Sequence, residues 1–291
     1  MQLSDSELIL NPDGSIYHLQ LLPEDLAPIV ITVGDPERVA QVSQHFDSIE
    51  VQKQSREFAT HTGYLGKKRI TVLSTGIGTD NIDIVLNELD ALVNIDFSTR
   101  TVKADKTSLS LIRIGTSGAL VPDLPVDTFL LSTSAIGMDG LMHFYDSEAL
   151  QNNSLNNAFV DHMAWTGQKI QPYTFDADPM LKSSFEKNRI RFGVTITNAG
   201  FYAPQGRKLR GKLQFDQFID QVSKFAHKDQ RITNLEMETA GIYGLARLLG
   251  HKAVSLNALL ANRITGEFSK NPAKTIDELI QFSLTQIATH C

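Results

Sequence analysis

Short apolar runs alternate along the chain with segments whose apolar side chains recur at helical spacing. The runs rich in β-branched residues predict buried strands at residues 27–34, 68–76, 108–115, 126–136, 189–200 and 252–262. Apolar residues three and four apart predict helices at residues 35–46, 81–94 and 271–290. Asp35 suits the N-cap of the first of these helices, and Pro36 suits its first turn. This alternation indicates an α/β fold around a largely buried sheet.

The stretch NLEMETAGIYGLARLLG, residues 234–250, predicts another helix from Ala240 onward. Glu236 and Glu238 then suit the positive end of a helix that begins just before them, with Thr233 or Asn234 as N-cap. That placement explains one glutamate better than two, because residues two apart point to different sides of a helix. We therefore expect the two carboxylates to have different roles, one structural and one as a ligand.

The chain has no linker, internal repeat or low-complexity segment. Two polar stretches, 95–107 and 147–160, have the character of excursions from the fold rather than domain boundaries. We expect a single domain spanning residues 1–291.

The composition narrows the classes of partner. A net charge of −6 and a pI of about 5.7 argue against nucleic acid or an anionic membrane as the main partner. No apolar run approaches the length of a membrane helix, and the acidic N-terminus is unlike a secretory signal. The one cysteine, Cys291, excludes an internal disulfide framework and a cysteine-based zinc site. A cytoplasmic protein without a metal site is the expectation.

Residues typical of a phosphate site stand where strands are predicted to end, which is where ligands of open α/β folds bind. VGDPER (33–38) supplies Gly34 and Arg38, and RIGTSGA (113–119) supplies Arg113, two hydroxyls and two glycines. Arginine forks, hydroxyls and free N–H groups suit a phosphate. A solvated helix face is the alternative for Arg38, and a buried ion pair the alternative for Arg113. The spacing is not that of a P-loop, which favours free phosphate over a nucleoside triphosphate.

The segment FYAPQGR, residues 201–207, has the side chains for a planar base. The Phe201 ring can stack, the Gln205 amide pairs with an edge that has one donor and one acceptor, and Arg207 donates to a carbonyl oxygen. Uracil fits this pattern, although a loop with one packed aromatic residue is the alternative. In NLEMETA, a carboxylate can accept from two vicinal ribose hydroxyls while Met237 packs against the sugar.

Taken in order, GDPER, SREF, STGIG, RIGTSGA, FYxxQGR, NLEMETA and NR resemble the motifs of nucleoside phosphorylases of the uridine phosphorylase type. The resemblance extends from about His18 to Arg263. It implies a three-layer α/β/α fold with a mixed central sheet. It also implies phosphorolysis of a pyrimidine nucleoside: uridine and phosphate give uracil and ribose 1-phosphate, reversibly. The enzyme class is that of the pentosyltransferases.

The resemblance also assigns roles to residues of this chain. The implied phosphate ligands are Gly34, Arg38, Arg56, Arg113 and Thr116. The implied ribose ligands are His18, Met237 and Glu238, and Glu238 faces the 2′- and 3′-hydroxyls. The implied base ligands are Ser117, Gly118, Phe201, Gln205, Arg207 and Glu236, with Arg263 standing near the base. The implied catalytic residues are Arg113, Gln205 and Arg207.

Two of these residues imply an oligomer. Arg56 resembles an arginine that reaches the phosphate of a neighbouring subunit's site, and His18 a histidine that reaches the ribose 5′-hydroxyl there. We therefore expect at least a homodimer that shares its active sites. Members of the family often form hexamers built as trimers of dimers.

Two departures from related enzymes bear on metal and substrate. Some bacterial members bind potassium between subunits through a glutamate, matched here by Glu57, and a serine, where this chain has Asn81; this counts against that ion. We expect no cofactor, with inorganic phosphate as co-substrate. Related purine phosphorylases carry a proton-donating aspartate in the segment matched by ANRIT (261–265), and Asn262 and Arg263 here favour a pyrimidine. A purine phosphorylase, a nucleosidase that uses water, and a binding protein without chemistry are the alternatives.

Overall fold

The computed structural model describes residues 2–164, 170–187 and 189–290; Cys291 lies outside these ranges. Thirteen strands are found in the described residues: β1 (Ile29–Val33), β2 (Ser48–Ser55), β3 (Phe58–Leu65), β4 (Lys68–Ser74), β5 (Ile95–Asp96), β6 (Thr101–Val102), β7 (Ser110–Ala119), β8 (Phe129–Gly137), β9 (Tyr173–Asp176), β10 (Ile190–Thr197), β11 (Ala226–His227), β12 (Gln230–Glu236) and β13 (Lys252–Asn262). The α-helices there are α1 (Pro36–Ser43), α2 (Thr79–Asn94), α3 (Asn153–Met163), α4 (Pro179–Ser184), α5 (Phe218–Ser223), α6 (Thr239–Leu249) and α7 (Pro272–His290).

Most strands join one mixed sheet in the order β11-β12-β10-β8-β13-β7-β1-β4-β3-β2, with β9 paired to β8. β7, β1 and β4 run parallel, whereas β13 and β8 pair antiparallel. β12 also pairs with β7, through Asn234 opposite Ala119 and Leu235 opposite Gly118. The sheet therefore curls so that the carboxyl ends of β7 and β12 meet.

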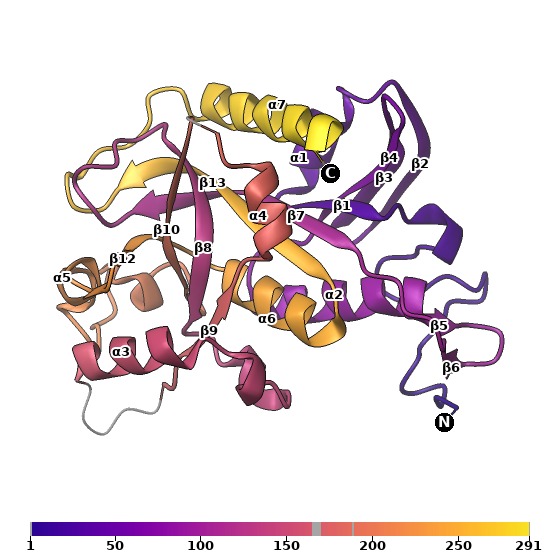
Figure 1. Cartoon of the computed structure of the whole chain (residues 1–291), viewed down its shortest axis with the longest axis horizontal. Coiled ribbons are helices and arrows are strands. Elements are labelled where there is room, and N and C mark those ends of the chain that lie inside the picture. The colour runs from indigo at the N-terminus through magenta and orange to yellow at the C-terminus, as the bar shows by residue number, and fades with distance from the viewer. Residues whose placement is uncertain (1, 165–169, 188, 291) are drawn as a thin grey trace.

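Helices cover both faces of this sheet (Figure 1). The apolar side chains of α1, α4 and α7 pack into one core with β1, β4, β7 and β13. Those of α2 and α6 pack into a second core with β9, and α3 and α5 into a third with β10 and β12. The predicted three-layer α/β/α fold with a mixed central sheet is confirmed.

Most of the predicted elements are present with shifted ends. β13 begins and ends where it was predicted, and Asp35 caps α1 by accepting a hydrogen bond from the Glu37 N–H at 2.9 Å. β7 runs four residues past the predicted end at Gly115, because Thr116–Ala119 pair with β13, and Gly118 and Ala119 also pair with β12. Arg113 therefore lies inside a strand and not near its end.

Two predictions from local sequence are wrong, and some elements were missed. Residues 230–236 form β12, so Thr233 and Asn234 are strand residues and the helix starts only at Thr239. The polar stretch 147–160 contains the start of α3, which buries Leu155 and Phe159. The strands β2 and β3 were not predicted; β2 is an edge strand with mainly exposed polar residues, so it lacks the apolar signal.

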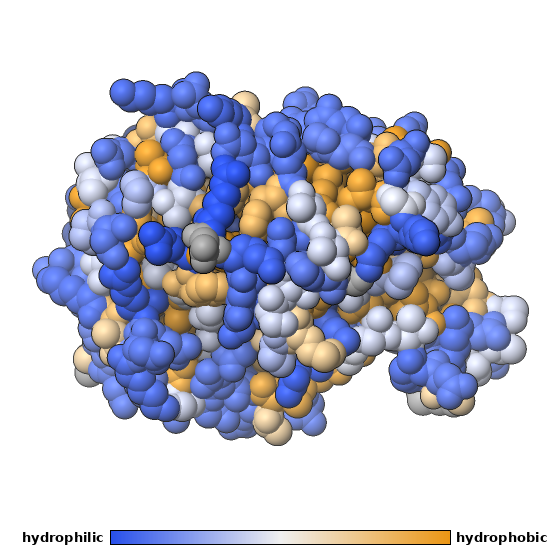
Figure 2. All heavy atoms as spheres, turned by 45° about the horizontal axis from the view of Figure 1, so that its top comes forward, coloured by the Kyte–Doolittle hydropathy of each residue, from blue (hydrophilic) through white to orange (hydrophobic). Residues whose placement is uncertain are grey.

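No helix in the described part of the chain combines the length and apolar character needed to span a bilayer. On the face shown in Figure 2, hydrophilic side chains predominate and apolar side chains form separate patches between them.

Candidate active site

A cavity of about 710 Å³ opens where the ends of β1, β4, β7 and β12 converge. The turn after β1 contributes Gly34 and Arg38, and the turn after β4 contributes Gly76 and Ile77. Twelve of the fourteen predicted site residues line it: Gly34, Arg38, Arg113, Thr116, Ser117, Gly118, Phe201, Gln205, Arg207, Glu236, Met237 and Glu238. Segments separated by up to about two hundred residues thus meet in one hollow, as the strand-end rule predicts.

One end of the cavity holds an arginine that is available to bind an anion. Arg38 projects from the first turn of α1, and its guanidinium forms no ion pair with any residue in the described ranges. Burial lowers the pKa of Arg38, and the neighbouring charge of Arg113 lowers it further against the opposing effect of Asp35. An anion bound beside Arg38 relieves both costs, and Thr116 supplies a hydroxyl in the same wall.

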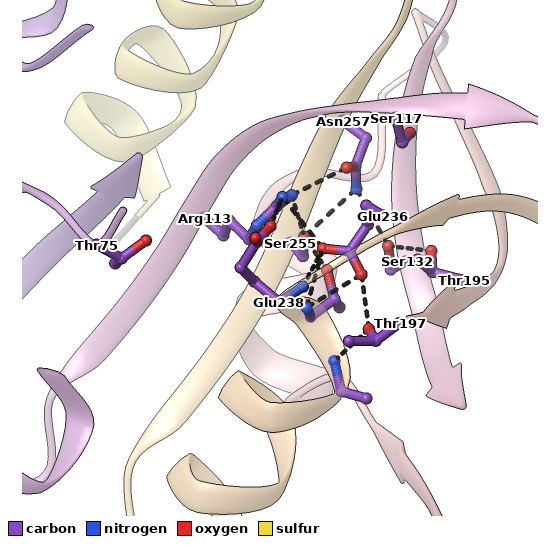
Figure 3. A network of polar contacts seen from close by, with 12 residues as sticks. Thr75, Arg113, Ser117, Ser132, Thr195, Thr197, Glu236, Glu238, Ser255 and Asn257 are labelled. Atoms are coloured by element: carbon purple, nitrogen blue, oxygen red, sulfur yellow. Dashed lines mark hydrogen bonds and ion pairs between the residues drawn. The ribbon is translucent and has the colours of Figure 1, made fainter. Parts of the chain in front are cut away.

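Arg113 is buried at the centre of a polar network (Figure 3). Its Nη2 lies 2.6 Å from Glu238 Oε2 and 3.1 Å from Glu236 Oε2, and its Nη1 donates to Asn257 Oδ1 at 3.0 Å. Burial disfavours the charge of Arg113, but the two carboxylates outweigh burial and raise the pKa of its guanidinium. The buried ion pair and the cavity position, which the sequence offered as alternatives, are therefore both present.

The two glutamates have different surroundings. Glu236 ends β12, and its carboxylate accepts from Thr197 Oγ1 at 2.6 Å and from the backbone N–H groups of Glu238 and Thr239 at 2.9 Å. It thus caps the start of α6 from the preceding strand. This engagement favours the structural role for Glu236 over the predicted contact with the base.

Glu238 accepts a hydrogen bond from the Gly78 N–H at 2.8 Å in addition to its ion pair with Arg113. Burial raises the pKa of the Glu238 carboxyl above its ordinary value; Glu236 adds to this effect and Arg113 opposes it. Glu238 thus contacts Arg113 at one end of the cavity, and the Gln205 amide of the loop at the other end donates to the carbonyl of Glu236, two residues before it, at 3.4 Å. A sugar bound by Glu238 would therefore lie between phosphate and base.

At the other end, an aromatic ring, an amide and two arginines are packed together. The Arg207 Cζ lies 3.7 Å from the centre of the Phe201 ring, and Arg207 also donates to Gln205 Oε1. Arg263 supports this loop by donating to the Gln205 carbonyl at 3.0 Å. Burial and the charge of Arg263 lower the pKa of Arg207 to about 10. A ligand oxygen that gains negative charge would be stabilised here.

His18 and Arg56 do not line this cavity. His18 Nδ1 lies 2.6 Å from Glu88 Oε1, and the exposed Arg56 lies with its Cζ 5.9 Å from the Tyr17 ring centre. Tyr17 in turn packs edge-on against His18, with the ring centres 4.7 Å apart. The two residues form a surface cluster of their own, and their role in a neighbouring subunit's site stays a prediction.

Several residues of the cavity wall were given no role in the substrate site by the sequence: Glu57, Gly76, Ile77, Asn81, Leu235, Leu260, Ala261 and Phe268. Gly76 belongs to the STGIG motif, but no role was assigned to it. Leu260 and Phe268 read as ordinary apolar residues, because only the tertiary fold places them beside the cavity. Glu57 and Asn81 both flank Gly76, so the two positions matched to the family's potassium ligands lie close together in this chain.

A comparison with known families identifies the fold and the site together. The sequence profile of the phosphorylase superfamily matches residues 28–287, a range that includes both ends of the cavity. The chain belongs to the phosphorylase superfamily. Among the superfamily's curated members, it is 30% identical over 259 residues to a uridine phosphorylase of Thermococcus kodakarensis, covering 89% of this chain and 81% of that protein.

Other superfamily members extend the likeness. A DeoD-type purine nucleoside phosphorylase of Myxococcus xanthus is 26% identical over 271 residues, covering 92% of this chain and 95% of that one. The crystal structure of a Trypanosoma brucei nucleoside phosphorylase, described as showing uridine phosphorylase activity, matches with a TM-score of 0.85 and 26% identity. That match covers 97% of this chain and 99% of the other. The resemblance seen in the motifs is therefore confirmed.

Proposed function

We propose that this phosphorylase cleaves uridine with inorganic phosphate, reversibly, to give uracil and ribose 1-phosphate. One observation carries the proposal: a single cavity has Arg38 and Arg113 at one end, Gln205 and Arg207 at the other, and Glu238 between them. Phosphate, ribose and a carbonyl-bearing base are arranged in that order in the reaction. The similarity to uridine phosphorylases supports the same substrate.

The reaction needs positioning more than a protein nucleophile. Arg38, Arg113 and Thr116 hold phosphate so that one of its oxygens attacks C1′ as the bond from C1′ to the base nitrogen breaks. The base leaves with the bonding electrons, and Gln205 and Arg207 stabilise the negative charge that develops on it. Hydrogen phosphate supplies the proton that makes neutral uracil. Glu238 holds the sugar by accepting from its hydroxyls.

A purine nucleoside phosphorylase is the second candidate, because such enzymes are among the relatives. The geometry of Asn262 argues against it. The Asn262 amide donates to the carbonyls of Val121 and Leu124, both at 3.0 Å, and its oxygen accepts from two backbone N–H groups of the next turn. This side chain is fully used in the fold, so it offers a purine base no proton.

The biological setting follows as part of the same proposal. The composition suits a cytoplasmic enzyme of nucleoside catabolism and pyrimidine salvage. A homodimer that shares its active sites, or a hexamer of such dimers, is supported by apolar side chains in the cavity wall that are mostly exposed in one chain: Ile77 at 68%, Phe268 at 65% and Phe201 at 51%.

The test is uracil release from uridine by the purified protein, with and without phosphate, and with inosine in parallel. Release that depends on phosphate, and faster cleavage of uridine than of inosine, is the expected result. Release without phosphate would mean a nucleosidase, and preferred cleavage of inosine a purine enzyme. Binding without cleavage would mean that the chemistry is absent.

A further inference from the structure

Five strands of the sheet close into a ring. β12 pairs with β10, β10 with β8, β8 with β13 and β13 with β7, and the pairing of β7 with β12 completes it. A chain of hydrogen-bonded polar side chains follows this ring strand by strand: Arg113 on β7, Asn257 on β13, Ser132 on β8, Thr195 on β10, Asn234 on β12 and Ser117 again on β7. Figure 3 shows its first part, from Arg113 to Thr195. Both ends of the chain line the cavity, and the four residues between them are 0% exposed.

Every contact in this chain is within hydrogen-bonding distance. Asn257 Nδ2 lies 3.3 Å from Ser132 Oγ, which lies 2.6 Å from Thr195 Oγ1. Thr195 Oγ1 lies 2.8 Å from Asn234 Oδ1, and Asn234 Nδ2 lies 2.9 Å from Ser117 Oγ. Buried polar chains of this kind specify one arrangement, because any unmade bond in them is costly.

The chemistry of arginine sets the direction of the whole chain. A guanidinium only donates, so the Asn257 oxygen must face Arg113 and its NH₂ group must face Ser132. Ser132 then accepts from Asn257 and gives its own hydrogen to Thr195. Thr195 must in turn donate onward, which requires the oxygen of Asn234, and the Asn234 NH₂ group is left to donate to Ser117.

The last member of the chain is therefore a donor. Ser117 Oγ accepts from Asn234, and its hydrogen has no acceptor among the residues that the structure describes. Ser117 lines the cavity, so that hydrogen is available to a ligand. A ligand atom that meets it must be an acceptor, such as a carbonyl oxygen.

We propose that this chain of hydrogen bonds positions two side chains of the active site, one at each of its ends. At one end it holds the Arg113 guanidinium for phosphate, and at the other it orients the Ser117 hydroxyl to donate to a carbonyl oxygen of the pyrimidine base. The inference rests on the proposed function and deepens it: Ser117, which the resemblance implies as a base ligand, becomes a donor of fixed direction, and Asn257 and Asn234 act through the residues that they orient. Because negative charge grows on the base during cleavage, the Ser117 hydrogen bond strengthens in the transition state.

The first test uses Ser117→Ala, which removes the donor from a half-buried position and leaves the buried chain in place. We expect kcat/KM for uridine to fall about fivefold to tenfold, the effect of one neutral hydrogen bond, while the KM for phosphate stays unchanged. The variant should also lose the preference for uridine over 2-thiouridine or over 4-thiouridine, since sulfur is a poor acceptor. A merely structural serine would leave both preferences intact, and that result would overturn the proposal.

The second test reverses the direction of the hydrogen bond between residue 234 and Ser117. In Asn234→Asp both carboxylate oxygens accept, so Ser117 must turn its hydrogen away from the cavity to donate to residue 234. We expect the same loss as in Ser117→Ala, and no further loss in the double variant. Asn257→Leu should disturb both Arg113 and Ser117, so it should raise the KM for phosphate and lower kcat/KM for uridine. If the losses from Ser117→Ala and Asn234→Asp add up in the double variant, Asn234 does not act through Ser117 and the proposal is wrong.

Controls separate these effects from loss of the fold. Thr60→Val removes a buried hydroxyl of the same sheet that has no hydrogen-bond partner among the described residues, and it should leave activity unchanged. Should Asn234→Asp fail to fold, Thr195→Val breaks the chain and Thr195→Ser restores it, so only the serine variant should recover activity. Wild-type protein that does not cleave uridine with phosphate would overturn the proposed function itself, and this result is visible without any variant.

Discussion

At the scale of single residues, the site depends on arginines in contrasting surroundings. Arg38 is partly exposed and has no ion-pair partner in the described structure, whereas Arg113 is buried against Glu236 and Glu238. Removal of Arg38 changes only the charge of the cavity. Removal of Arg113 also leaves two carboxylates buried without their counter-ion. The two substitutions should therefore differ in their effect on the stability of the fold.

Arg38→Ala should raise the KM for phosphate about tenfold or more, as expected for a charge-assisted contact, and leave the free energy of unfolding within about 0.5 kcal/mol of wild type. Initial rates at varied phosphate and a urea titration measure the two quantities. Arg247→Ala, which removes an exposed arginine of α6 outside this cavity, is the matched control. An unchanged KM for phosphate in Arg38→Ala would contradict the assignment of this end of the cavity.

Arg113→Ala should abolish most of the activity and also destabilise the fold by about 3–5 kcal/mol, the cost of breaking a buried ion pair by removing one partner. Thermal and urea unfolding of this variant beside Arg38→Ala measures the difference. Equal stability of the two variants would mean that the carboxylates do not need Arg113.

At the scale of elements, β7 carries the site. It places Arg113, Thr116, Ser117 and Gly118 along one strand, and it pairs with β1, β13 and β12. Gly115 lets the Arg113 side chain fold back along this strand, because a Cβ built at residue 115 would lie 2.0 Å from Arg113 Nη1. The glycine thus makes space for the guanidinium.

Gly115→Ala should therefore displace the Arg113 guanidinium and lower kcat/KM on the order of 100-fold, the scale of effect of misplacing a catalytic group by about 1 Å. The fold should survive, because the backbone of residue 115 is ordinary strand. Steady-state kinetics with a circular dichroism melt measures both, and Gly211→Ala, in open space on the surface, is the control. Wild-type activity in Gly115→Ala would mean that Arg113 needs no such space.

The sequence was sufficient for the elements that have strong local patterns and for twelve of the residues that line the cavity, but not for the rest of the cavity wall. Strand ends marked by glycine, arginine and hydroxyl residues converge because parallel strands end at one edge. β12 was missed because its local pattern merges into the helix that follows. Asn257 and Ser132 were missed for another reason: a buried asparagine or serine within an apolar run has no meaning until the ring of strands is known.

At the scale of the whole molecule, the position of His18 and Arg56 bears on assembly. Both lie away from the cavity of their own chain, at a surface cluster with Tyr17. If they complete a neighbouring subunit's site, each site consists of Arg38 from one chain and Arg56 from its partner. Two variants, each lacking one of these arginines, should then complement each other in a mixed dimer.

A mixture of Arg38→Ala and Arg56→Ala chains tests this arrangement. Assayed with phosphate well below KM, each variant alone should have about a tenth of wild-type activity or less, but a mixed dimer has one site with both arginines. After equal amounts are unfolded and refolded together, about a quarter of wild-type activity should return, since half of the dimers are mixed and each has one complete site of two. No recovery in verified mixed dimers, or an active monomer, would contradict shared sites.

The proposed function requires transfer of the ribosyl group from the base to phosphate. The most direct measurement is a ³¹P NMR spectrum of wild-type protein with uridine and phosphate, recorded while uracil is measured in the same sample. We expect a ribose 1-phosphate signal that grows in step with uracil. When uracil is added in excess, this signal should decline while uridine returns. Uracil released with free ribose and no new phosphorus signal would contradict it.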